Sequence, residues 1–377
     1  MILAIDGYEA NVATRVGIGR FAYELLVRLA KLVASGSSEF TEVRVYLPDA
    51  PLPDMPKESA TWKYRILSPK KFWTFFRLPI ALFTDKPLAD VVFSPTHYVP
   101  RFTSIPRVMA IMDTSYLLYP ELFRKQDLHK LIHWTAYSAK NSSSIITISE
   151  YSKRAIIKAY NVASNYVNVV YPGLVQTQST SNAMGKEITK KYDLSARFIL
   201  SVGTLQPRKN FTKLIEAFST ISDKQIQLVI VGKKGWLYDE ILEAPKTYKV
   251  EDRVKFLEFV PDEDLPLLYT QAQCFVCPSL YEGFGLPVLE AMAHGCPVVI
   301  SDVSSLPEIA ADAAVYIDPK SVQSIAQGLS TAISDKGKPA EKKRIQEGAK
   351  RVKLFSWDKA AKEVLTKLED VGRKGSL

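Results

Sequence analysis

The sequence predicts two α/β domains, each built on a parallel β-sheet that is covered by helices. Short apolar runs alternate with helical patterns in the first half of the chain, and the same alternation begins again in the second half. Such alternation is typical of parallel sheets whose two faces are both buried. A length of 377 residues exceeds one ordinary core and suits two domains of similar size.

The composition is that of a folded globular protein, with 47% hydrophobic and 24% charged residues. No apolar run approaches the ~20 residues of a bilayer-spanning helix, and Met1–Asp6 is a predicted strand rather than a secretory leader. Three cysteines do not suggest a disulfide framework, so we expect a cytoplasmic protein. The net charge of +9 favours anionic partners, namely nucleic acid, anionic lipid or phosphorylated small molecules.

Six apolar runs in the first half are predicted strands with helices between them. They are Ile2–Ile5, Val43–Tyr46, Val91–Phe93, Val108–Ile111, Ser144–Ile148 and Val167–Val170. The polar stretch Gln176–Asn182 is a predicted linker. We therefore expect an N-terminal domain at residues 1–172, completed by a closing helix at 357–377, and a C-terminal domain at 173–356.

Five further apolar runs are the predicted strands of the second domain. They are Phe198–Val202, Gln227–Val231, Val254–Phe256, Cys274–Cys277 and Pro297–Ile300. Helices should begin near Asn210, Asp262, Gly285 and Ser304. Ligands of such sheets bind at the carboxyl ends of the strands, so the loops that follow the strands are the place to look for chemistry.

The loop after Phe198–Val202 carries two cations just before a predicted helix. Gly203 allows a sharp turn and a close approach of a ligand, and Arg208 and Lys209 precede the helix start. Two cations next to backbone N–H groups suit a diphosphate. The alternative is an ordinary loop with two solvated charges.

The segment that follows Cys274–Cys277 places two carboxylates around a glycine-containing loop. Glu282 lies in the loop and Glu290 lies within the next helix, and both could face one cleft as acceptors for sugar and ribose hydroxyls. The amide groups of Gly285, Leu286 and Val288 are expected to be free to bind a phosphate or sugar oxygen. The alternative is one capping and one solvated glutamate.

These segments resemble the nucleotide-sugar-binding domain of the retaining family-4 glycosyltransferases of the GT-B fold. The matching pieces between residues 202 and 308 are Val202–Leu205, Arg208–Asn210, Val229–Gly232, Val260–Leu265, Pro278–Glu290, Gly295–Ile300 and Pro307–Glu308. Weaker matches outside that span are Ile146–Lys153, Tyr171–Gly173 and Phe355–Trp357. The resemblance implies two Rossmann-like domains that face each other across a cleft.

The resemblance also implies roles for individual residues. Arg208 and Lys209 would hold the donor diphosphate and stabilise the leaving nucleotide, Glu282 would bind the donor sugar, and Glu290 would bind the ribose. The backbone that would contact sugar and phosphate comprises Gly283, Phe284, Gly285 and Leu286. Residues near Val260 and Leu265 would border the base. No metal or other cofactor is expected, because the two cations and the helix N-terminus would neutralise the charge.

The first domain offers fewer signals. Gly17 and Gly19 open its first helix and, as in the family, could let the loop pass close to the donor phosphate or the acceptor, although a plain turn fits equally well. Many relatives have a His-Asp pair at the end of a strand where this chain has Met112 and Asp113, so Asp113 remains as a contact to acceptor or sugar. His97 follows another strand and is an acceptor-side candidate, against a role in loop packing.

Several other features have a functional and a structural interpretation. Residues 70–77 combine cations with aromatics and could dock on an anionic membrane surface, or could pack as an ordinary helix. The pairs Cys274 with Cys277 and His129 with His133 lack further ligands nearby, so we expect no metal site. No nucleic-acid-binding module accompanies the basic stretches, so nucleic acid is not an expected partner.

The sequence thus predicts a metal-independent glycosyltransferase that acts on a nucleoside-diphosphate-sugar and a hydroxyl acceptor, with retention. The acceptor would be a glycan or a lipid-linked glycan, with the enzyme in the cytoplasm or peripheral on the inner face of the membrane. One alternative is a nucleotide-sugar epimerase or hydrolase of the same fold. The other is a non-catalytic protein that binds nucleotide-sugars and docks on membranes.

Overall fold

A computed structural model of the chain describes residues 1–175 and 182–375. The predicted linker, Gln176–Asn182, lies outside the described residues except for Asn182, where helix α6 (Asn182–Lys191) begins. The chain divides into two compact units. The first contains Met1–Leu118, Lys125–Gly173 and Ser356–Leu377, and the second contains Tyr119–Arg124 and Leu174–Phe355.

The first unit is built on one sheet of seven parallel strands in the order β3-β2-β1-β4-β5-β6-β7. Their bounds are β1 Ile2–Asp6, β2 Glu42–Leu47, β3 Trp62–Ile66, β4 Val91–Ser94, β5 Arg107–Ala110, β6 Ser144–Thr147 and β7 Val167–Val169. Strand β3 was not predicted. It lies at the sheet edge, where Lys63 and Arg65 interrupt the apolar residues, so it forms no apolar run.

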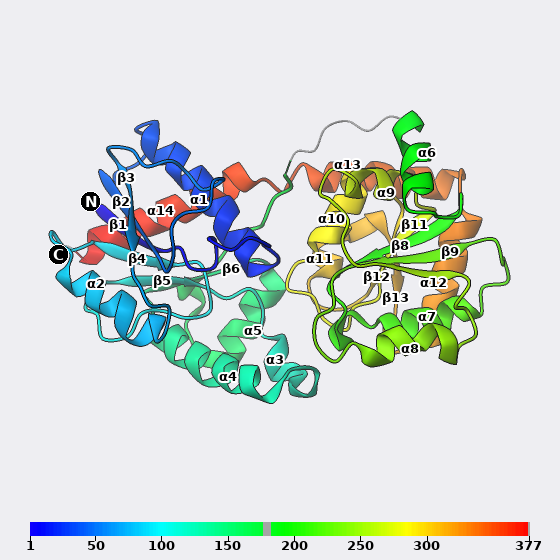
Figure 1. Cartoon of the computed structure of the whole chain (residues 1–377), viewed down its shortest axis with the longest axis horizontal. Helices are drawn as coiled ribbons and strands as arrows, with labels where there is room; N and C mark the ends of the chain where they lie inside the picture. The colour runs from blue at the N-terminus through cyan, green and yellow to red at the C-terminus, as the bar shows by residue number, and fades with distance from the viewer. Residues whose placement is uncertain (176–181, 376–377) are drawn as a thin grey trace. The chain divides into compact units, whose positions relative to one another are not determined.

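Helices cover both faces of this sheet (Figure 1). Helices α1 (Ile18–Ala34) and α14 (Trp357–Gly375) pack together on one face. Helices α2 (Leu78–Thr84), α4 (Lys125–Lys140) and α5 (Glu150–Tyr160) lie on the other, and α3 (Ser115–Leu118) adjoins α4. A π-helical turn, Trp73–Arg77, leads directly into α2.

The second unit has six parallel strands in the order β10-β9-β8-β11-β12-β13. Their bounds are β8 Phe198–Val202, β9 Gln227–Val231, β10 Val254–Leu257, β11 Cys274–Cys277, β12 Val298–Ser301 and β13 Ala314–Ile317. The short strand β13 was not predicted. Strand order reverses between β8 and β11, and in such sheets ligands bind at the carboxyl ends of the strands beside this point.

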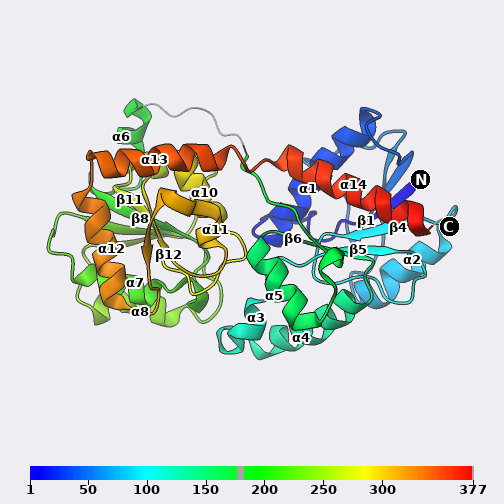
Figure 2. The same cartoon turned by 180° about the vertical axis from the view of Figure 1, so that it is seen from behind.

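The helices of the second unit also form two layers (Figure 2). One layer holds α6, α9 (Leu265–Gln271), α10 (Leu286–Ala293) and α13 (Pro339–Val352), and the other holds α7 (Phe211–Ser219), α8 (Asp239–Thr247) and α12 (Val322–Ser334). Helices predicted to begin near Asn210, Asp262, Gly285 and Ser304 begin at Phe211, Leu265, Leu286 and, for α11 (Leu306–Ala310), Leu306. The prediction of two Rossmann-like α/β domains is confirmed. Across residues 1–175 and 182–375, no helix combines the length and apolar character needed to cross a membrane.

Two motifs far apart in the sequence meet where the chain leaves the first unit and returns to it. A Cβ atom at Gly173 would lie 2.1 Å from the backbone nitrogen of Trp357 and 2.5 Å from the carbonyl carbon of Ser356. Trp357 is buried and its ring packs 5.9 Å from that of Phe21 on α1. Only glycine therefore fits at position 173, because the neighbouring atoms are backbone and have no room to move.

We expect Gly173→Ala to lower the free energy of unfolding by about 3 kcal/mol or more, since the new methyl group overlaps backbone atoms. The matched control is Gly36→Ala, a site with φ of 74° and open space around it. In that variant the free energy of unfolding should fall by only ~1–2 kcal/mol, the cost of holding alanine in a left-handed conformation. Urea unfolding followed by circular dichroism compares the two, and equal losses would contradict the steric argument.

Candidate active site

Two cations and a carboxylate form a buried cluster at the carboxyl ends of β8 and β11. Arg208 and Lys209 lie in a 3-10 turn, Pro207–Lys209, and Glu282 lies in the loop after β11. Lys209 Nζ donates to Glu282 Oε1 at 2.6 Å and Arg208 donates to Glu282 Oε2 at 3.2 Å. The side chains of Arg208 and Lys209 are only 15% and 13% exposed, so they are not solvated loop charges.

Electrostatics keep Glu282 ionised in this cluster. Burial alone would raise the pKa of its carboxyl, but Lys209 and Arg208 outweigh that effect and lower it to about 2. Ser279 Oγ also donates to Glu282 Oε1, at 2.6 Å. Within the described residues Oε2 accepts a hydrogen bond from Arg208 alone, so it can accept another from a ligand hydroxyl.

Glycine at position 203 leaves room for the lysine. A Cβ atom there would lie 3.2 Å from Lys209 Cε and 3.4 Å from Lys209 Cδ. The lysine side chain thus lies over the Gly203 backbone on its way to Glu282. Gly203 was predicted to permit the close approach of a ligand, and the group that lies against it in the structure is Lys209.

Several polar residues that the sequence analysis did not assign to the site hold these loops in place. Asn210 Nδ2 donates to the carbonyl oxygens of Pro278 at 3.0 Å and Pro319 at 2.7 Å. The Glu282 N–H donates to Ser304 Oγ, and Ser305 Oγ donates to the carbonyl oxygens of Glu282 and Phe284. Spacing along the chain does not reveal these residues, because their partners lie in other loops.

Helix α10 begins directly after the Glu282 loop. Gly285 precedes it with φ of 111°, a conformation that favours glycine. The expectation that the Val288 amide is free was wrong, because Val288 N–H donates to the Gly285 carbonyl at 3.0 Å. The first intrahelical bond therefore begins at Val288, and the amides of Gly285 and Leu286 precede it. Gly283, Phe284 and Gly285 are buried beside them.

The remaining donor-site candidates of the second unit lie around helix α9. Glu290, on the second turn of α10, accepts a hydrogen bond at 3.0 Å from the buried Tyr269 hydroxyl of α9. Burial and the charge of Glu290 both raise the pKa of Tyr269, so that hydroxyl remains a donor. Leu265 is the first residue of α9, and Val260 is buried in the loop before it.

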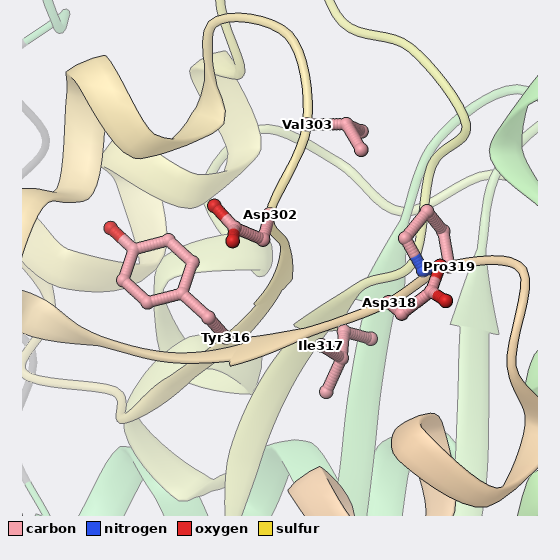
Figure 3. Close-up of a pocket in the computed structure, with 6 residues that line it drawn as sticks. All are labelled: Asp302, Val303, Tyr316, Ile317, Asp318 and Pro319. Carbon is pink, nitrogen blue, oxygen red and sulfur yellow. The ribbon is translucent and has the colours of Figure 1, made fainter.

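An open cavity of about 320 Å³ lies at the ends of β12 and β13 (Figure 3). Its lining residues are Asp302, Val303, Tyr316, Ile317, Asp318 and Pro319. None of them is a predicted site residue. The cavity nevertheless lies next to the residues that hold the loops around Glu282. Its lining residue Val303 precedes Ser304 and Ser305, and the carbonyl of Pro319 accepts a hydrogen bond from Asn210.

In the first unit, His97 and Asp113 lie at the carboxyl ends of β4 and β5. Met112 N–H donates to His97 Nε2 at 3.2 Å, and Asp113 Oδ1 accepts from the N–H and hydroxyl of Ser115 at 2.8 and 2.6 Å. His97 Nδ1 is buried without a hydrogen-bond partner among the described atoms. Burial lowers the pKa of His97, opposed by Asp113, so the ring is neutral and Nε2 is free to accept.

The two glycines of the first helix differ in what they require. Gly17 precedes α1 with φ of 51° and ψ of −115°, in open space. Gly19 is buried, and a Cβ atom there would lie 3.0 Å from the Glu9 carbonyl oxygen. The loop that opens α1 therefore depends on glycine at one position for conformation and at the other for space.

Of the residues weighed as metal ligands, only Cys277 adjoins the cluster: among the described contacts, its Sγ lies 4.0 Å from Glu282 Oε1. Cys274 and Cys277 are free and buried in β11. His129 and His133 are on the exposed side of α4 with ring centroids 4.4 Å apart. Within residues 1–175 and 182–375, no group of three or more His, Cys, Asp or Glu side chains is placed to hold a metal ion.

The neutral state of His97 should make stability depend on pH. A folded-state pKa below that of the unfolded chain gives stability that is present above about pH 6.5 and lost as the pH falls. The slope is at most about 1.4 kcal/mol per pH unit for one proton. Gln at position 97 can still accept from the Met112 N–H, so we expect His97→Gln to show a shallower loss of unfolding free energy between pH 7 and 5.

The control is His133→Gln, which changes an exposed histidine and should retain the wild-type slope. Urea unfolding at several pH values gives all three curves. If the unfolding free energy of His97→Gln fell with pH as steeply as that of the wild type, protonation of His97 would not be the cause of the pH dependence.

Comparison with known proteins shows the family of the chain. Residues 186–352 match the family described as Glycosyl transferases group 1. The chain is 29% identical over 373 residues to O-antigen chain mannosyltransferase B of Escherichia coli, covering 93% of this chain and 94% of that protein. It is 31% identical over 284 residues to an uncharacterized glycosyltransferase of Methanocaldococcus jannaschii, covering 72% of each.

Solved structures share the fold. Anabaena Alr3699/HepE, solved in complex with UDP and glucose, superposes with a TM-score of 0.73 at 20% identity, over 97% of this chain and 98% of that one. The two parallel α/β units thus have the GT-B fold. Together with the matched sequence relatives, this means that the chain belongs to the group 1 glycosyl transferases.

Proposed function

We propose that this glycosyltransferase moves a sugar from a nucleoside-diphosphate-sugar to a hydroxyl of a glycan or lipid-linked acceptor. The bond between the anomeric carbon and the β-phosphate oxygen would break, a bond from that carbon to the acceptor oxygen would form, and the hydroxyl proton would be released. The observation that carries the proposal is the buried cluster of Arg208, Lys209 and Glu282 beside the first turn of α10.

The charges of the cluster suit a departing diphosphate. Two cations and one carboxylate leave a net positive charge in a site with little access to water. Within the described residues Lys209 Nζ bonds to Glu282 alone, so two of its three N–H donors remain for a ligand. The N-terminus of α10 adds partial positive charge. These groups would stabilise negative charge as it develops on the leaving nucleotide.

The carboxylates would bind the two ends of the donor. Glu282 Oε2 would accept from a sugar hydroxyl, and Glu290, held by Tyr269, would accept from the ribose. Val260 and Leu265 would lie near the base. We also propose retention of anomeric configuration, which rests on the resemblance of residues 278–290 to the retaining family. Turnover would need no metal, since the protein's own cations neutralise the diphosphate.

In the first unit, Asp113 would contact the acceptor or the sugar, and the Gly17–Gly19 loop would approach the donor phosphate. His97 would act through the Met112 backbone that it holds. The three cysteines of the chain are free and buried, which suits a reducing cytoplasm. We assign the product to polysaccharide or glycolipid synthesis, because the E. coli relative is an O-antigen chain mannosyltransferase. Mannose is for the same reason the first donor sugar to test.

A donor panel tests the reaction class. Purified protein is incubated in EDTA with GDP-mannose, UDP-glucose, UDP-galactose and dTDP-rhamnose, each with and without mannosyl or glucosyl lipid acceptors. We expect one donor to give a glycosylated acceptor and free nucleotide, with the anomeric configuration read by NMR. Donor consumption without acceptor would instead show an epimerase or hydrolase, and turnover only after a divalent metal is added would refute metal independence.

Lys209→Ala tests the role of the cation. We expect turnover to fall by roughly a hundredfold, the order of magnitude for a lost transition-state contact. Lys224→Ala, which removes an exposed lysine from the turn before β9, is the matched control and should keep wild-type turnover. Circular dichroism melts check that both variants fold. Near-normal turnover in folded Lys209→Ala would remove Lys209 from the mechanism.

A further inference from the structure

Helix α2 and the π-helical turn before it expose one side lined with large apolar residues. These are Phe72, Phe76, Ile80 and Phe83, which are 67, 53, 56 and 74% exposed. Their spacing of four, four and three residues places them along one side of the continuous helical segment. The opposite side is already used: Trp73, Leu78 and Leu82 are buried in the core against β1, β2 and β4.

Nearby residues add to this surface, which we call the aromatic face. Leu88 is 42% and Phe102 is 76% exposed. Phe102 belongs with the helical segment because the preceding Arg101 N–H donates to Thr74 O at 3.0 Å. Among the described residues, four of the five exposed phenylalanines lie here, and the fifth is Phe259 in the second unit. Exposed apolar side chains gathered in this way mark an interaction site.

Cations surround the aromatic face. Lys70, Lys71, Arg77 and Lys86 are all exposed, and Lys86 Nζ lies 5.3 Å from the Phe83 ring centroid. The one carboxylate between residues 69 and 88 is Asp85, which is half-buried and accepts from Tyr46 and Arg65. Lys70 also pairs with Asp49 at 2.8 Å. The surface therefore offers aromatic rings for an apolar layer and positive charge for an anionic one.

The backbone supports an external role for these rings. Phe72 and Phe102 have φ of 58° and 56°, in the left-handed region that bulky residues rarely adopt. Neither ring is buried, and the Phe72 ring packs only against the exposed Phe76, at 5.9 Å between centroids among the described ring contacts. Exposed phenylalanines gain little from burial on folding, so covering them with an apolar layer would be favourable.

We infer, resting on the proposed function, that the aromatic face inserts into the headgroup region of an anionic lipid bilayer. Aromatic side chains flanked by lysine and arginine are the composition of helices that lie in a membrane interface. Interfacial docking would bring a lipid-linked acceptor to the enzyme. The occupant is a lipid surface, since the phenylalanines supply the apolar contact and the cations match the charge of its headgroups.

The docking segment is joined to the first unit at the carboxyl end of β1. Trp73 Nε1 donates to Asp6 Oδ1 at 3.0 Å, and the Trp73 ring packs 5.6 Å from that of Tyr8. Asp6 also accepts from Tyr8 N–H, and its burial raises its pKa to about 7. Trp73 therefore joins the aromatic face to the carboxyl end of β1, the strand that precedes the Gly17–Gly19 loop. Both views show α2 on the outside of this unit (Figures 1 and 2).

Vesicle co-sedimentation of the full chain tests the inference. We expect binding to phosphatidylcholine vesicles that contain about one-third phosphatidylglycerol, weaker binding to phosphatidylcholine alone, and release by high salt. The double variant Phe76→Ser with Phe83→Ser should bind at least about tenfold more weakly, since two rings leave the interface. The control Leu354→Ser with Leu237→Ser removes two apolar side chains of the second unit, each 54% exposed, and should bind as wild type.

Other results would overturn the inference. Equal binding by the two double variants would show that the aromatic face is not the docking surface, and equal binding to both vesicle types would remove the role of the cations. Absence of vesicle binding, with a dimer in sedimentation velocity that Phe76→Ser with Phe83→Ser abolishes, would assign the face to a second copy of the chain. Transfer to a water-soluble acceptor should be unchanged in both double variants, so failure of docking and failure of the proposed function give different results.

Discussion

The buried carboxylate of Glu282 organises the second unit, because an ionised group with so little water requires partners from several loops at once. An unpaired buried carboxylate would shift its pKa upward and neutralise. Here Lys209, Arg208 and Ser279 keep it charged. Removing one partner of such a group typically costs about 3–5 kcal/mol. The two cations are consequently fixed in place before any ligand arrives, which is the preorganisation that electrostatic catalysis needs.

Two glycines of the second unit allow the close packing around this cluster, because a side chain at either position would meet its neighbours. A Cβ atom at Gly232 would lie 1.9 Å from the Gly203 carbonyl oxygen, so the ends of β8 and β9 approach backbone to backbone. Gly203 in turn lies beneath the Lys209 side chain. The motifs Val202–Leu205 and Val229–Gly232 are thus two parts of one steric constraint. Gly232 is required by backbone that is distant in sequence, so the motif Val229–Gly232 alone is weak evidence of function.

Local pattern was enough to predict most strands, because buried parallel strands are apolar runs, and it placed Arg208, Lys209 and Glu282 in loops at one sheet edge. Strand β3 was missed for a local reason, because its apolar residues alternate with Lys63 and Arg65 and form no continuous run. Local pattern did not predict the features that depend on tertiary contacts. Ser304 and Ser305 act only through the Glu282 loop. Residues 70–77 were recognised as cationic and aromatic, but periodicity did not show which rings face outward, since a π-helical turn changes the register before α2.

Two sites in this protein depart from the rule that charged side chains are exposed and apolar side chains are buried. The second unit buries charge around Glu282, and the first unit exposes aromatic rings around Phe76. Neither departure favours folding, since buried charge is costly and exposed rings gain nothing from burial. Local conflicts of this kind are expected where a ligand completes the structure. A diphosphate would complete the charged cluster around Glu282, and a lipid surface would cover the aromatic face. An enzyme that transfers a sugar from a nucleotide donor to a lipid-linked acceptor would use one site of each kind.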